Sequence, residues 1–448
     1  MATPTRPSEL HPELVEGRQP EQAARDDAAP RSNGEVTHRP GQRIAVVSAH
    51  TSPLARPGGA KSGGLNVYVL ELARQLAILD CQVDIFTRAT ASSQPEVTLI
   101  EPNLRLIALQ AGPAEPIAPD DLYGHLDAFY EALLAFARED GVAYDLIHSH
   151  YWLSCLVGAR LKALWDVPHV VMFHTLGEIK NRASHGEHES ALRIESEIAV
   201  LAAADRIICA TEIERDSLRQ LYGVSDEKVS IIPLGVDLER FRPAGKQDAR
   251  AALGLTDERI VLFVGRIEPL KGVDILINAA SLLESDVECT VLIVGGDDSS
   301  QAEVADLRNL ARDRGIEHRV AFVGAVDHET LPLYYNAADV CVVPSHYESF
   351  GLVAVEAMAS GVPVVASRVG GLTGTIKDGE TGYLVPWLCP EPFAERIELL
   401  LENEPLRKDL GEAAREAMAR YRWENVATTV LSVYEELLNR PAGLFTTP

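Results

Sequence analysis

Short, continuous runs of apolar residues alternate with longer segments of helical periodicity along the first half of the chain. The apolar runs predict strands at 43–48, 83–86, 145–149, 169–173, 206–209 and 229–232. The periodic segments predict helices at 66–79, 121–139, 153–164, 189–203 and 212–222. Strands that are apolar throughout and separated by helices favour parallel sheets covered on both faces.

A break containing proline and glycine, at 233–243, interrupts this rhythm, which then restarts. Further strands are expected at 260–264, 291–294, 320–323, 340–343 and 362–366, with helices at 273–283, 301–314, before the last of these strands, and from about 391 to 438. We therefore expect an α/β protein with two Rossmann-like domains facing a central cleft. The N-terminal domain is placed at 41–240, the C-terminal domain at 241–420, and a terminal helix and tail at 421–448. The break is the candidate hinge.

Residues 1–40 are rich in Pro, Glu, Arg, Gln and Ala, and are expected to form a disordered tail. The whole chain has 448 residues and a formal charge of −25, whereas a generic nucleic-acid binder is more often basic. The six scattered cysteines form no CxxC pair, and most are expected to be small buried hydrophobes. No apolar run is long enough to span a membrane and no secretory signal is apparent, so a cytoplasmic location is expected.

The first strand is followed by a glycine-rich loop, from His50 to Asn66, that enters a helix. Ligands bind α/β sheets at such strand ends, and the backbone N–H groups of glycines can approach phosphate oxygens. The loop has neither a dinucleotide-binding nor a Walker pattern, because Ala60 stands where the glycine before Lys61 would be needed. A flexible connector is the alternative interpretation.

The second domain opens with an equivalent strand end, which carries Arg266 and Lys271. Two cations there could bind a diphosphate, the arginine in bidentate fashion and the lysine as a point charge. Taken alone, two basic residues in a loop are more often solvated surface.

Two glutamates eight residues apart form the most specific pattern of the chain. Glu348 falls in a loop before a helix, and Glu356 lies in that helix between Ala and Val residues. A carboxylate in so apolar a helix is costly to bury unless it accepts hydrogen bonds, which ligand hydroxyls would supply. The following Arg368–Gly371 segment is expected to form another flexible, ligand-facing turn.

With these motifs the chain resembles the retaining glycosyltransferases of family four, which have the GT-B fold, over residues 43 to 435. The Glu348-to-Glu356 spacing is the E-x7-E signature of that family. Within it, the N-terminal half most resembles the enzymes that glycosylate inositol phosphate, and sucrose-phosphate synthases share a looser version. The stretches that carry this likeness include Ser62–Tyr68, Asp145–Ser154, His174–Leu176 and Lys180–Asn181.

The resemblance implies a nucleotide-sugar donor, UDP-N-acetylglucosamine or UDP-glucose, held against the C-terminal domain. Arg266 and Lys271 would hold its pyrophosphate together with N–H groups of Gly63 and Gly64, and Glu356 its ribose. Glu348 would bond the donor sugar, with N–H groups of Phe350, Gly351 and Leu352 nearby, and His174 would touch the sugar near the reacting carbon. His174, Glu348, Arg266 and Lys271 are therefore the candidate catalytic residues.

The acceptor, a small hydroxylated molecule, would by the same resemblance sit in the N-terminal domain. Its expected contacts are His50, Lys61, Ser62, Asn66, Tyr151, Thr175 and Arg193. Two departures concern it: Pro119 stands where similar enzymes carry a phosphate-binding lysine, and Lys61 stands where they carry Asp. Either Lys61 takes over part of the phosphate binding, or the acceptor is not phosphorylated. The terminal helix would return to the first domain, and a homodimer is a family-based expectation.

No cofactor or catalytic metal is expected, since the nucleotide sugar is a substrate. His148 with His150 and His185 with His188 have ligand-like spacings but lack a complete donor set, and Asp297 with Asp298, just after a strand, is interpreted as a polar turn. Donor sugar and acceptor stay open: glucosyl transfer of the sucrose-phosphate-synthase kind and glycosylation of a lipid or polysaccharide precursor are alternatives. A non-catalytic sugar-nucleotide binder and a nicotinamide oxidoreductase are disfavoured, the latter because no GxGxxG follows either opening strand.

Overall fold

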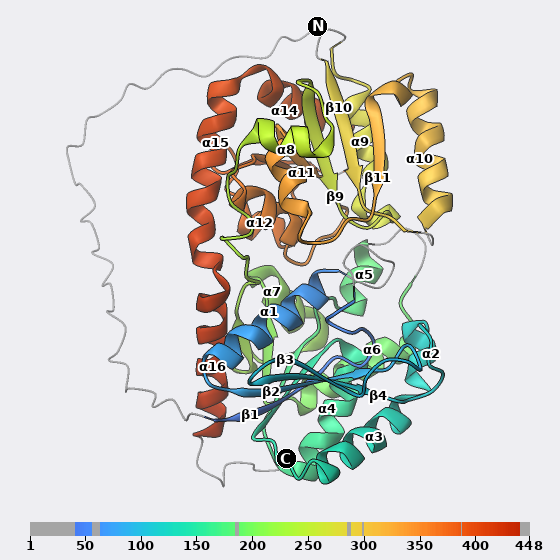
Figure 1. Ribbon diagram of the computed structural model, residues 1–448, viewed down its shortest axis with the longest axis vertical. Coiled ribbons are helices and arrows are strands. Elements are labelled where there is room, and N and C mark those ends of the chain that lie inside the picture. The colour runs from blue at the N-terminus through green and yellow to red at the C-terminus, as the bar shows by residue number, and fades with distance from the viewer. Residues whose placement is uncertain are drawn as a thin grey trace, which may run out of the picture. The chain divides into compact units, whose positions relative to one another are not determined.

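The computed structural model describes residues 41–55, 63–183, 188–284, 288–297, 300–386 and 388–439. The expected tail at 1–40 and the residues Lys61, Ser62, His185 and Asp298 lie outside these ranges. The described part of the chain contains two sheets of mainly parallel strands with helices on both faces (Figure 1). The expected α/β architecture of two Rossmann-like domains is confirmed.

The N-terminal sheet has eight strands among the described residues, in the order β3-β4-β2-β1-β5-β6-β7-β8, and only the β3–β4 pair is antiparallel. Its strands are β1 Arg43–Val47, β2 Gln82–Arg88, β3 Val97–Glu101, β4 Leu104–Leu109, β5 Leu146–His150, β6 His169–Met172, β7 Arg206–Cys209 and β8 Val229–Ile231. The helices between them are α1 Gly64–Ile78, α2 Pro119–Tyr123, α3 Leu126–Glu139, α4 Trp152–Trp165, α5 Gly177–Ala183, α6 Ala191–Ala203 and α7 Glu212–Tyr222.

The C-terminal sheet has six parallel strands in the described chain, in the order β11-β10-β9-β12-β13-β14. They are β9 Arg259–Val264, β10 Cys289–Val294, β11 Val320–Gly324, β12 Val340–Val343, β13 Val364–Ser367 and β14 Tyr383–Val385. The helices are α8 Lys246–Leu253, α9 Val273–Ala280, α10 Gln301–Asp313, α11 Leu331–Ala337, α12 Leu352–Ala359, α13 Leu372–Thr375, α14 Pro390–Glu402, α15 Glu404–Ala417 and α16 Trp423–Leu438.

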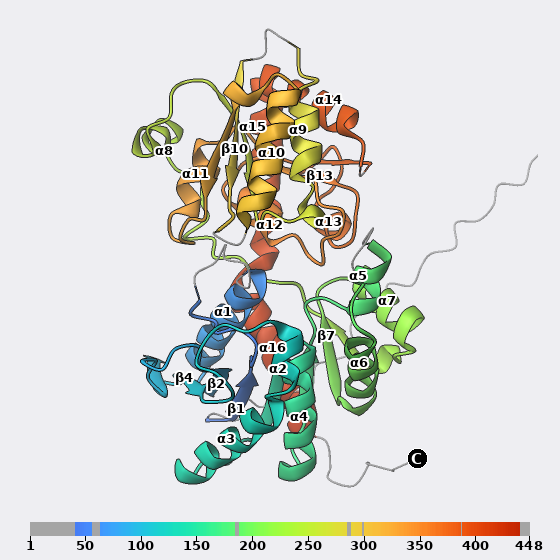
Figure 2. The same ribbon diagram turned by 90° about the vertical axis from the view of Figure 1, so that its right-hand side faces the viewer.

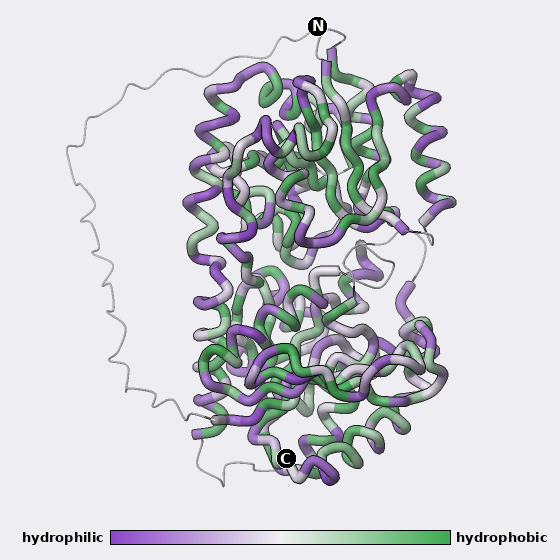
Figure 3. Tube along the Cα trace, viewed as in Figure 1, coloured by the Kyte–Doolittle hydropathy of each residue, from purple (hydrophilic) through white to green (hydrophobic). Residues whose placement is uncertain are grey.

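The alternation of side chains along each strand explains why both faces of the sheets are covered. In β1, Ile44 and Val46 pack into the apolar cluster that includes α1 and α16, while Ala45 and Val47 pack into the cluster that includes α3 and α4. Figure 2 shows the same arrangement in the C-terminal sheet, with α9 and α10 on one side and α11 on the other. The strands of both sheets are accordingly hydrophobic along much of their length, whereas α10 and α15 carry many polar residues (Figure 3).

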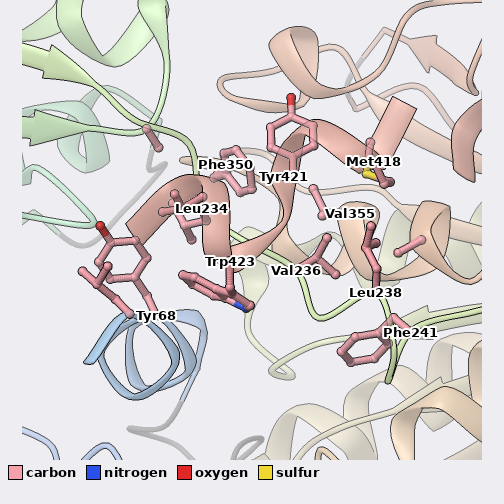
Figure 4. Packing of buried hydrophobic residues seen from close by; sticks show 14 of the residues in the cluster. Tyr68, Leu234, Val236, Leu238, Phe241, Phe350, Val355, Met418, Tyr421 and Trp423 are labelled. Atoms are coloured by element: carbon pink, nitrogen blue, oxygen red, sulfur yellow. The ribbon is translucent and has the colours of Figure 1, made fainter. Parts of the chain in front are cut away.

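The apolar residues of the segment that joins the two sheets are buried. Leu234, Val236 and Phe241 are 7%, 2% and 1% exposed and belong to an apolar cluster that continues into both sheets (Figure 4). Val236 N–H donates to Tyr421 O at 2.7 Å, and a Cβ on Gly235 would meet the Trp423 ring at 2.3 Å. Contacts with the start of α16 therefore fix the path of this linker.

The last three helices run from the C-terminal sheet back to the N-terminal one. α14 and α15 pack on each other, and α16 packs against α1, with the rings of Tyr68 and Trp423 edge to face at 5.7 Å (Figures 1 and 4). The helical segments expected from about 391 to 438 are therefore three helices with two breaks between them. Asn403 caps the start of α15 by accepting from Leu406 N–H at 3.1 Å, and extended backbone at Arg422 precedes α16.

Other differences from the sequence expectations concern short or partly polar elements. The helix expected at 121–139 is two helices, α2 and α3, because the chain turns at Gly124, a residue with low helix propensity. The strands β3, β4 and β14 were not expected; the mixed polar and apolar residues of β3 occupy the exposed edge of the sheet. The short helices α5, α8, α11 and α13 were not expected either. Five cysteines are buried and free, as expected, and Cys389 is exposed.

Candidate active site

A cavity of about 560 Å³ lies where the carboxyl ends of both sets of strands meet. Side chains and loops that follow β1, β5 and β6 form one wall, and those that follow β9, β10 and β12 form the other. Parallel α/β sheets bind ligands at this end. Every described residue that the sequence analysis assigned to a donor or acceptor lines this cavity: His50, Gly63, Gly64, Asn66, Tyr151, His174, Thr175, Arg193, Arg266, Lys271, Glu348, Phe350, Gly351, Leu352 and Glu356.

Two helices point their N-termini at the cavity from opposite domains. α1 begins at Gly64, after the N-cap Gly63, and α12 begins at Leu352, after the N-cap Gly351. The two ends are close, since a Cβ on Gly64 would lie 3.6 Å from Leu352 Cδ2. Unpaired N–H groups and the positive end of each helix dipole favour an anion here.

Both predicted diphosphate-binding cations are paired with carboxylates. Lys271 Nζ lies 2.7 Å from Glu348 Oε2, and Arg266 Nη2 lies 2.8 Å from Glu268 Oε1. The next residue, Gly272, has φ +66°, and a Cβ there would meet Pro344 O at 2.1 Å. Glycine is therefore required for the Lys271 turn to pack against the end of β12.

The loop that carries Glu348 is supported from behind by the glycines after β13. Gly371 N–H donates to Glu348 O at 2.9 Å, and a Cβ on Gly370 would meet the same oxygen at 2.1 Å. The Arg368–Gly371 turn does not line the cavity. The expectation of a ligand-facing turn is therefore wrong: the two glycines allow the backbone to approach and hold the Glu348 loop.

Glu356 lies in α12 and is 4% exposed, and protein groups already bond both of its oxygens. Tyr335 Oη donates to Oε2 at 2.8 Å, and His328 Nε2 is 2.9 Å from Oε1. His328 Nδ1 faces Arg240 Nη1 at 2.9 Å and must accept, so Nε2 carries the proton and donates to Glu356. Ligand hydroxyls are thus not the only partners of this carboxylate, contrary to the sequence argument. Each oxygen keeps a second lone pair for them.

The opposite wall contains a group of enclosed histidines. His174, at the end of β6, has φ +62°, a strained conformation for a non-glycine residue, and its Nε2 lies 3.1 Å from His150 Nδ1. Burial lowers the pKa of His174 to about 3, with further contributions from His148 and His50. The pKa of His50 is also lowered to about 3, by burial and by Arg193. Near pH 7 both imidazoles are therefore neutral hydrogen-bonding groups rather than cations.

Arg193 is a buried cation fixed by its neighbours, with a side chain that is 2% exposed. Its Nη2 donates to Thr175 O at 2.8 Å, and its guanidinium lies over the Tyr151 ring at 5.1 Å. Burial disfavours the charged form, but Tyr151, Glu197 and Glu189 outweigh it and raise the pKa of Arg193. A permanent positive charge thus stands in this wall.

The structure adds residues that the sequence analysis did not assign. Glu197 is fully buried and accepts from Arg193 Nε at 2.8 Å, from Tyr222 Oη at 2.6 Å and from Gly177 N–H. Lys180 also lines the cavity and pairs with Glu189, whose other oxygen is 2.8 Å from Arg193 Nη1. The spacing of Arg193 and Glu197, one helical turn apart, was a usable signal for this pair. No local pattern indicated His328 or Tyr335 as partners of Glu356.

The two departures noted for the acceptor site, Pro119 and Lys61, differ in whether the structure describes them. Pro119 lines the cavity at the first position of α2, so no side-chain cation is present at that position. Lys61 and Ser62 fall outside the described residues. Asn66 is 1% exposed and donates to Ser52 O at 2.8 Å, which holds the loop that follows His50.

Among the described residues, no group of three His, Cys, Asp or Glu side chains is arranged to hold a metal ion. His148 Nδ1 bonds Tyr434 Oη at 2.7 Å, and His150 bonds His174. In the same ranges, no helix is long and apolar enough to cross a membrane.

Comparison with known proteins relates both halves of the chain to glycosyltransferases. The model "Glycosyltransferase Family 4" matches residues 62–240, and the model "Glycosyl transferases group 1" matches residues 245–417. D-inositol 3-phosphate glycosyltransferase 2 of Catenulispora acidiphila is 44% identical over 403 residues, which cover 88% of this chain and 94% of that protein. The D-inositol 3-phosphate glycosyltransferase of Corynebacterium efficiens is 42% identical, covering 88% and 95%.

Among solved structures, the sucrose-phosphate synthase of Thermosynechococcus elongatus superimposes with a TM-score of 0.82 at 39% identity, over 88% of this chain and 99% of that one. HepE of Anabaena, solved with UDP-glucose, has a TM-score of 0.71 at 21% identity, over 88% and 100%. At that identity the likeness concerns the fold alone.

Proposed function

Because this chain belongs to the glycosyltransferases of family 4, we propose that it moves a hexose or N-acetylhexosamine from a nucleotide diphosphate to a hydroxyl of a small phosphorylated polyol or sugar. UDP-N-acetylglucosamine or UDP-glucose is the proposed donor, inositol phosphate the proposed acceptor, and the reaction retains the configuration of the sugar. One observation carries this proposal: the same cavity has cations on two facing walls, Arg266 and Lys271 on one and Arg193 and Lys180 on the other. A donor diphosphate and an acceptor phosphate each require such partners.

On the donor side, the diphosphate would bind between Lys271, Arg266 and the N-terminus of α1 at Gly63 and Gly64. Glu356, held by Tyr335 and His328, would accept from the ribose hydroxyls with its free lone pairs. Glu348 would accept from a hydroxyl of the sugar, near the N-terminus of α12 formed by Phe350, Gly351 and Leu352. Because these carboxylates are oriented before the ligand arrives, little ordering cost remains at binding.

In the proposed mechanism, the bond between the anomeric carbon and the phosphate oxygen breaks, and the bonding electrons leave with the diphosphate. Arg266 and Lys271 stabilise the negative charge that develops there. The acceptor oxygen forms its bond on the same face of the sugar and loses its proton to the leaving phosphate, so no protein nucleophile is assigned. His174, neutral at pH 7, hydrogen-bonds the sugar beside the reacting carbon.

On the acceptor side, Arg193 would donate to the phosphate, with Thr175, Tyr151 and Lys180 around it. Lys180 and Arg193 share the carboxylate of Glu189, and Arg193 also pairs with Glu197, so a phosphate would have to compete with these two carboxylates for the cations. This wall supplies cations although Pro119 does not, and the suggestion that Lys61 contributes as well remains a hypothesis. His50 and Asn66 would contact the hydroxyl-bearing part of the acceptor.

The test is transfer from UDP-, ADP- and GDP-sugars to inositol phosphate, fructose 6-phosphate and unphosphorylated inositol. Product from UDP-N-acetylglucosamine with inositol phosphate, and none with inositol, is the expected result. Transfer to unphosphorylated inositol with equal kcat/KM would overturn the phosphorylated acceptor. For Lys61, an unchanged KM for the phosphorylated acceptor in Lys61→Ala would remove that residue from the site.

A second candidate is transfer of glucose to fructose 6-phosphate, because the solved structure with a TM-score of 0.82 is a sucrose-phosphate synthase. Product from UDP-glucose with fructose 6-phosphate, and none with inositol phosphate, would favour it. Glycosylation of a lipid or polysaccharide precursor is the remaining alternative, and it predicts no product with any of the three acceptors.

We also propose a cytoplasmic enzyme that needs no metal or organic cofactor, and a homodimer in solution. Transfer should continue in excess EDTA, since Arg266, Lys271 and two helix N-termini stabilise the diphosphate. Loss of activity that Mg²⁺ restores would contradict this. Size-exclusion chromatography with light scattering decides the oligomeric state.

A further inference from the structure

A second cavity, of about 510 Å³, lies at the amino end of the C-terminal sheet. Its lining includes Arg259, the first residue of β9, Asp339, which directly precedes β12, and Pro363, which directly precedes β13. The candidate active site lies at the carboxyl ends of the same strands. The two cavities are therefore at opposite ends of the sheet and share no lining residue.

The charge of this second cavity is opposite in sign to that of the whole chain. Five cations and three carboxylates line it: Lys246, Arg250, Arg259, Arg407, Lys408, Asp257, Asp339 and Glu404. The chain as a whole carries a formal charge of −25. A local excess of positive charge in so acidic a protein requires a physical reason.

Part of the reason is Asp339, whose fully buried carboxylate lies at the centre of the cations. Lys246 Nζ is 2.6 Å from it, Arg250 Nη2 2.9 Å, Arg407 Nε 3.5 Å and Arg259 Nη1 3.6 Å. One carboxylate neutralises one of these four charges. Burial lowers the pKa of both Lys246 and Arg407 despite the attraction of Asp339, as expected where cations are enclosed together.

The cations fall into two groups by their hydrogen bonds. Arg250 and Arg407 are almost buried and donate to backbone carbonyls, including Ala337 O and Leu400 O, so they are fixed parts of the wall. The side chains of Lys246, Arg259 and Lys408 are 36%, 43% and 68% exposed. Arg407 and Lys408 are the fourth and fifth residues of α15, close to the positive end of the helix dipole, and Lys408 Nζ lies 2.7 Å from Glu404 Oε1.

We propose that this cavity is a binding site for a small phosphate-bearing anion, with Lys246, Arg259 and Lys408 as the groups that contact it. Lysine and arginine are the usual partners of phosphate oxygens. The volume exceeds that of a phosphate group and falls within the range of small-molecule sites, so a ligand of the size of a phosphorylated sugar fits. This site is independent of the donor and acceptor proposed above, because it lies at the other end of the strands.

The alternative is that the cations only stabilise Asp339 and the ends of β9 and β12. The two explanations differ in one observable, which is binding of a free anion. We would titrate inorganic phosphate and pyrophosphate into the full-length protein by isothermal calorimetry. If the proposed function is correct, the active site binds these anions as well. The contribution of the second cavity is therefore obtained by comparing the isotherms of variants with that of the wild type.

The variant is Lys246→Ala with Lys408→Ala, which removes two contacting charges and leaves Arg250 on Asp339. The control is Lys377→Ala, whose lysine is 66% exposed, pairs with Glu380 and lines neither cavity. We expect the anion-binding component of the second cavity to have a Kd at least tenfold higher in the double variant. The same component should be unchanged in Lys377→Ala and should persist in Lys271→Ala. Transfer activity of the double variant should match the wild type.

Identical isotherms for the wild type and the double variant, or loss of all anion binding in Lys271→Ala, would overturn the proposal. Neither outcome depends on which sugar or acceptor the enzyme uses. Failure of this site and failure of the proposed function are therefore distinguishable.

Discussion

Replacing Glu348 by glutamine should make the protein bind the nucleotide product more tightly while it transfers sugar more slowly. Lys271 Nζ is 2.7 Å from Glu348 Oε2 in the ligand-free protein. A diphosphate oxygen that approaches Lys271 at about 2.8 Å would then lie no more than about 5.5 Å from the carboxylate. The two negative charges would share one cation and repel each other.

The magnitude follows from that separation. Two unit charges about 5.5 Å apart, at an effective dielectric constant of about 20, repel by roughly 3 kcal/mol. The side chains of Lys271 and Glu348 are 21% and 17% exposed, so screening reduces this value. With about 1.4 kcal/mol left after screening, Glu348→Gln should lower the Kd for UDP about tenfold. Loss of a carboxylate that orients the sugar should reduce kcat by about a hundredfold or more.

The assay is calorimetric titration of UDP together with steady-state kinetics of transfer. Glu380→Gln is the matched control, because Glu380 forms an exposed pair with Lys377 outside the cavity. Lys271→Ala should weaken UDP binding, which is a change of the opposite sign to that expected for Glu348→Gln. Weaker UDP binding in a folded Glu348→Gln protein would refute the reasoning that Glu348 and the diphosphate compete for Lys271.

Three further predictions follow from buried charge. Arg193→Lys keeps a cation, but a lysine cannot reach Thr175, Glu189 and Glu197 together. Steady-state kinetics should therefore give an acceptor KM about tenfold higher and an unchanged donor KM. A tenfold change corresponds to the loss of one charge-assisted hydrogen bond. An equal rise in the donor KM would contradict it. Asp339→Asn leaves four cations around a neutral group and should cost about 3–5 kcal/mol in urea unfolding, whereas the exposed Asp257→Asn should cost almost nothing. The third concerns four histidines whose pKa is lowered to about 3 by burial: His50, His148, His169 and His174. In the unfolded chain these histidines have a pKa of about 6.5 and bind protons below that pH, whereas in the folded protein they stay neutral. The free energy of unfolding should therefore fall as the pH drops from 6.5 towards 3, by up to about 1.4 kcal/mol per pH unit for each histidine. Urea unfolding that is independent of pH between 6.5 and 4.5 would contradict it.

Much of the candidate site could be predicted because its residues lie next to strong local signals. Arg266, Lys271 and Glu348 each follow a strand that is apolar throughout, and the carboxyl ends of parallel strands meet at one edge. The resemblance to family four then joined the two halves. The prediction of a ligand-facing turn at Arg368–Gly371 was wrong. Glycine permits close approach either to a ligand or to backbone, and the sequence does not show which of the two occurs.

Sequence by itself determined the order and type of most long elements and the family, because apolar periodicity and motif spacing are local properties. Tertiary structure alone decided which groups are partners. Glu356 contacts His328 and Tyr335, Asp339 lies among four cations from three elements, and Gly235 of the linker packs against Trp423. These contacts join residues far apart in the chain. They arise because a buried charge or polar group must find a partner, and only the folded chain determines which groups are within reach.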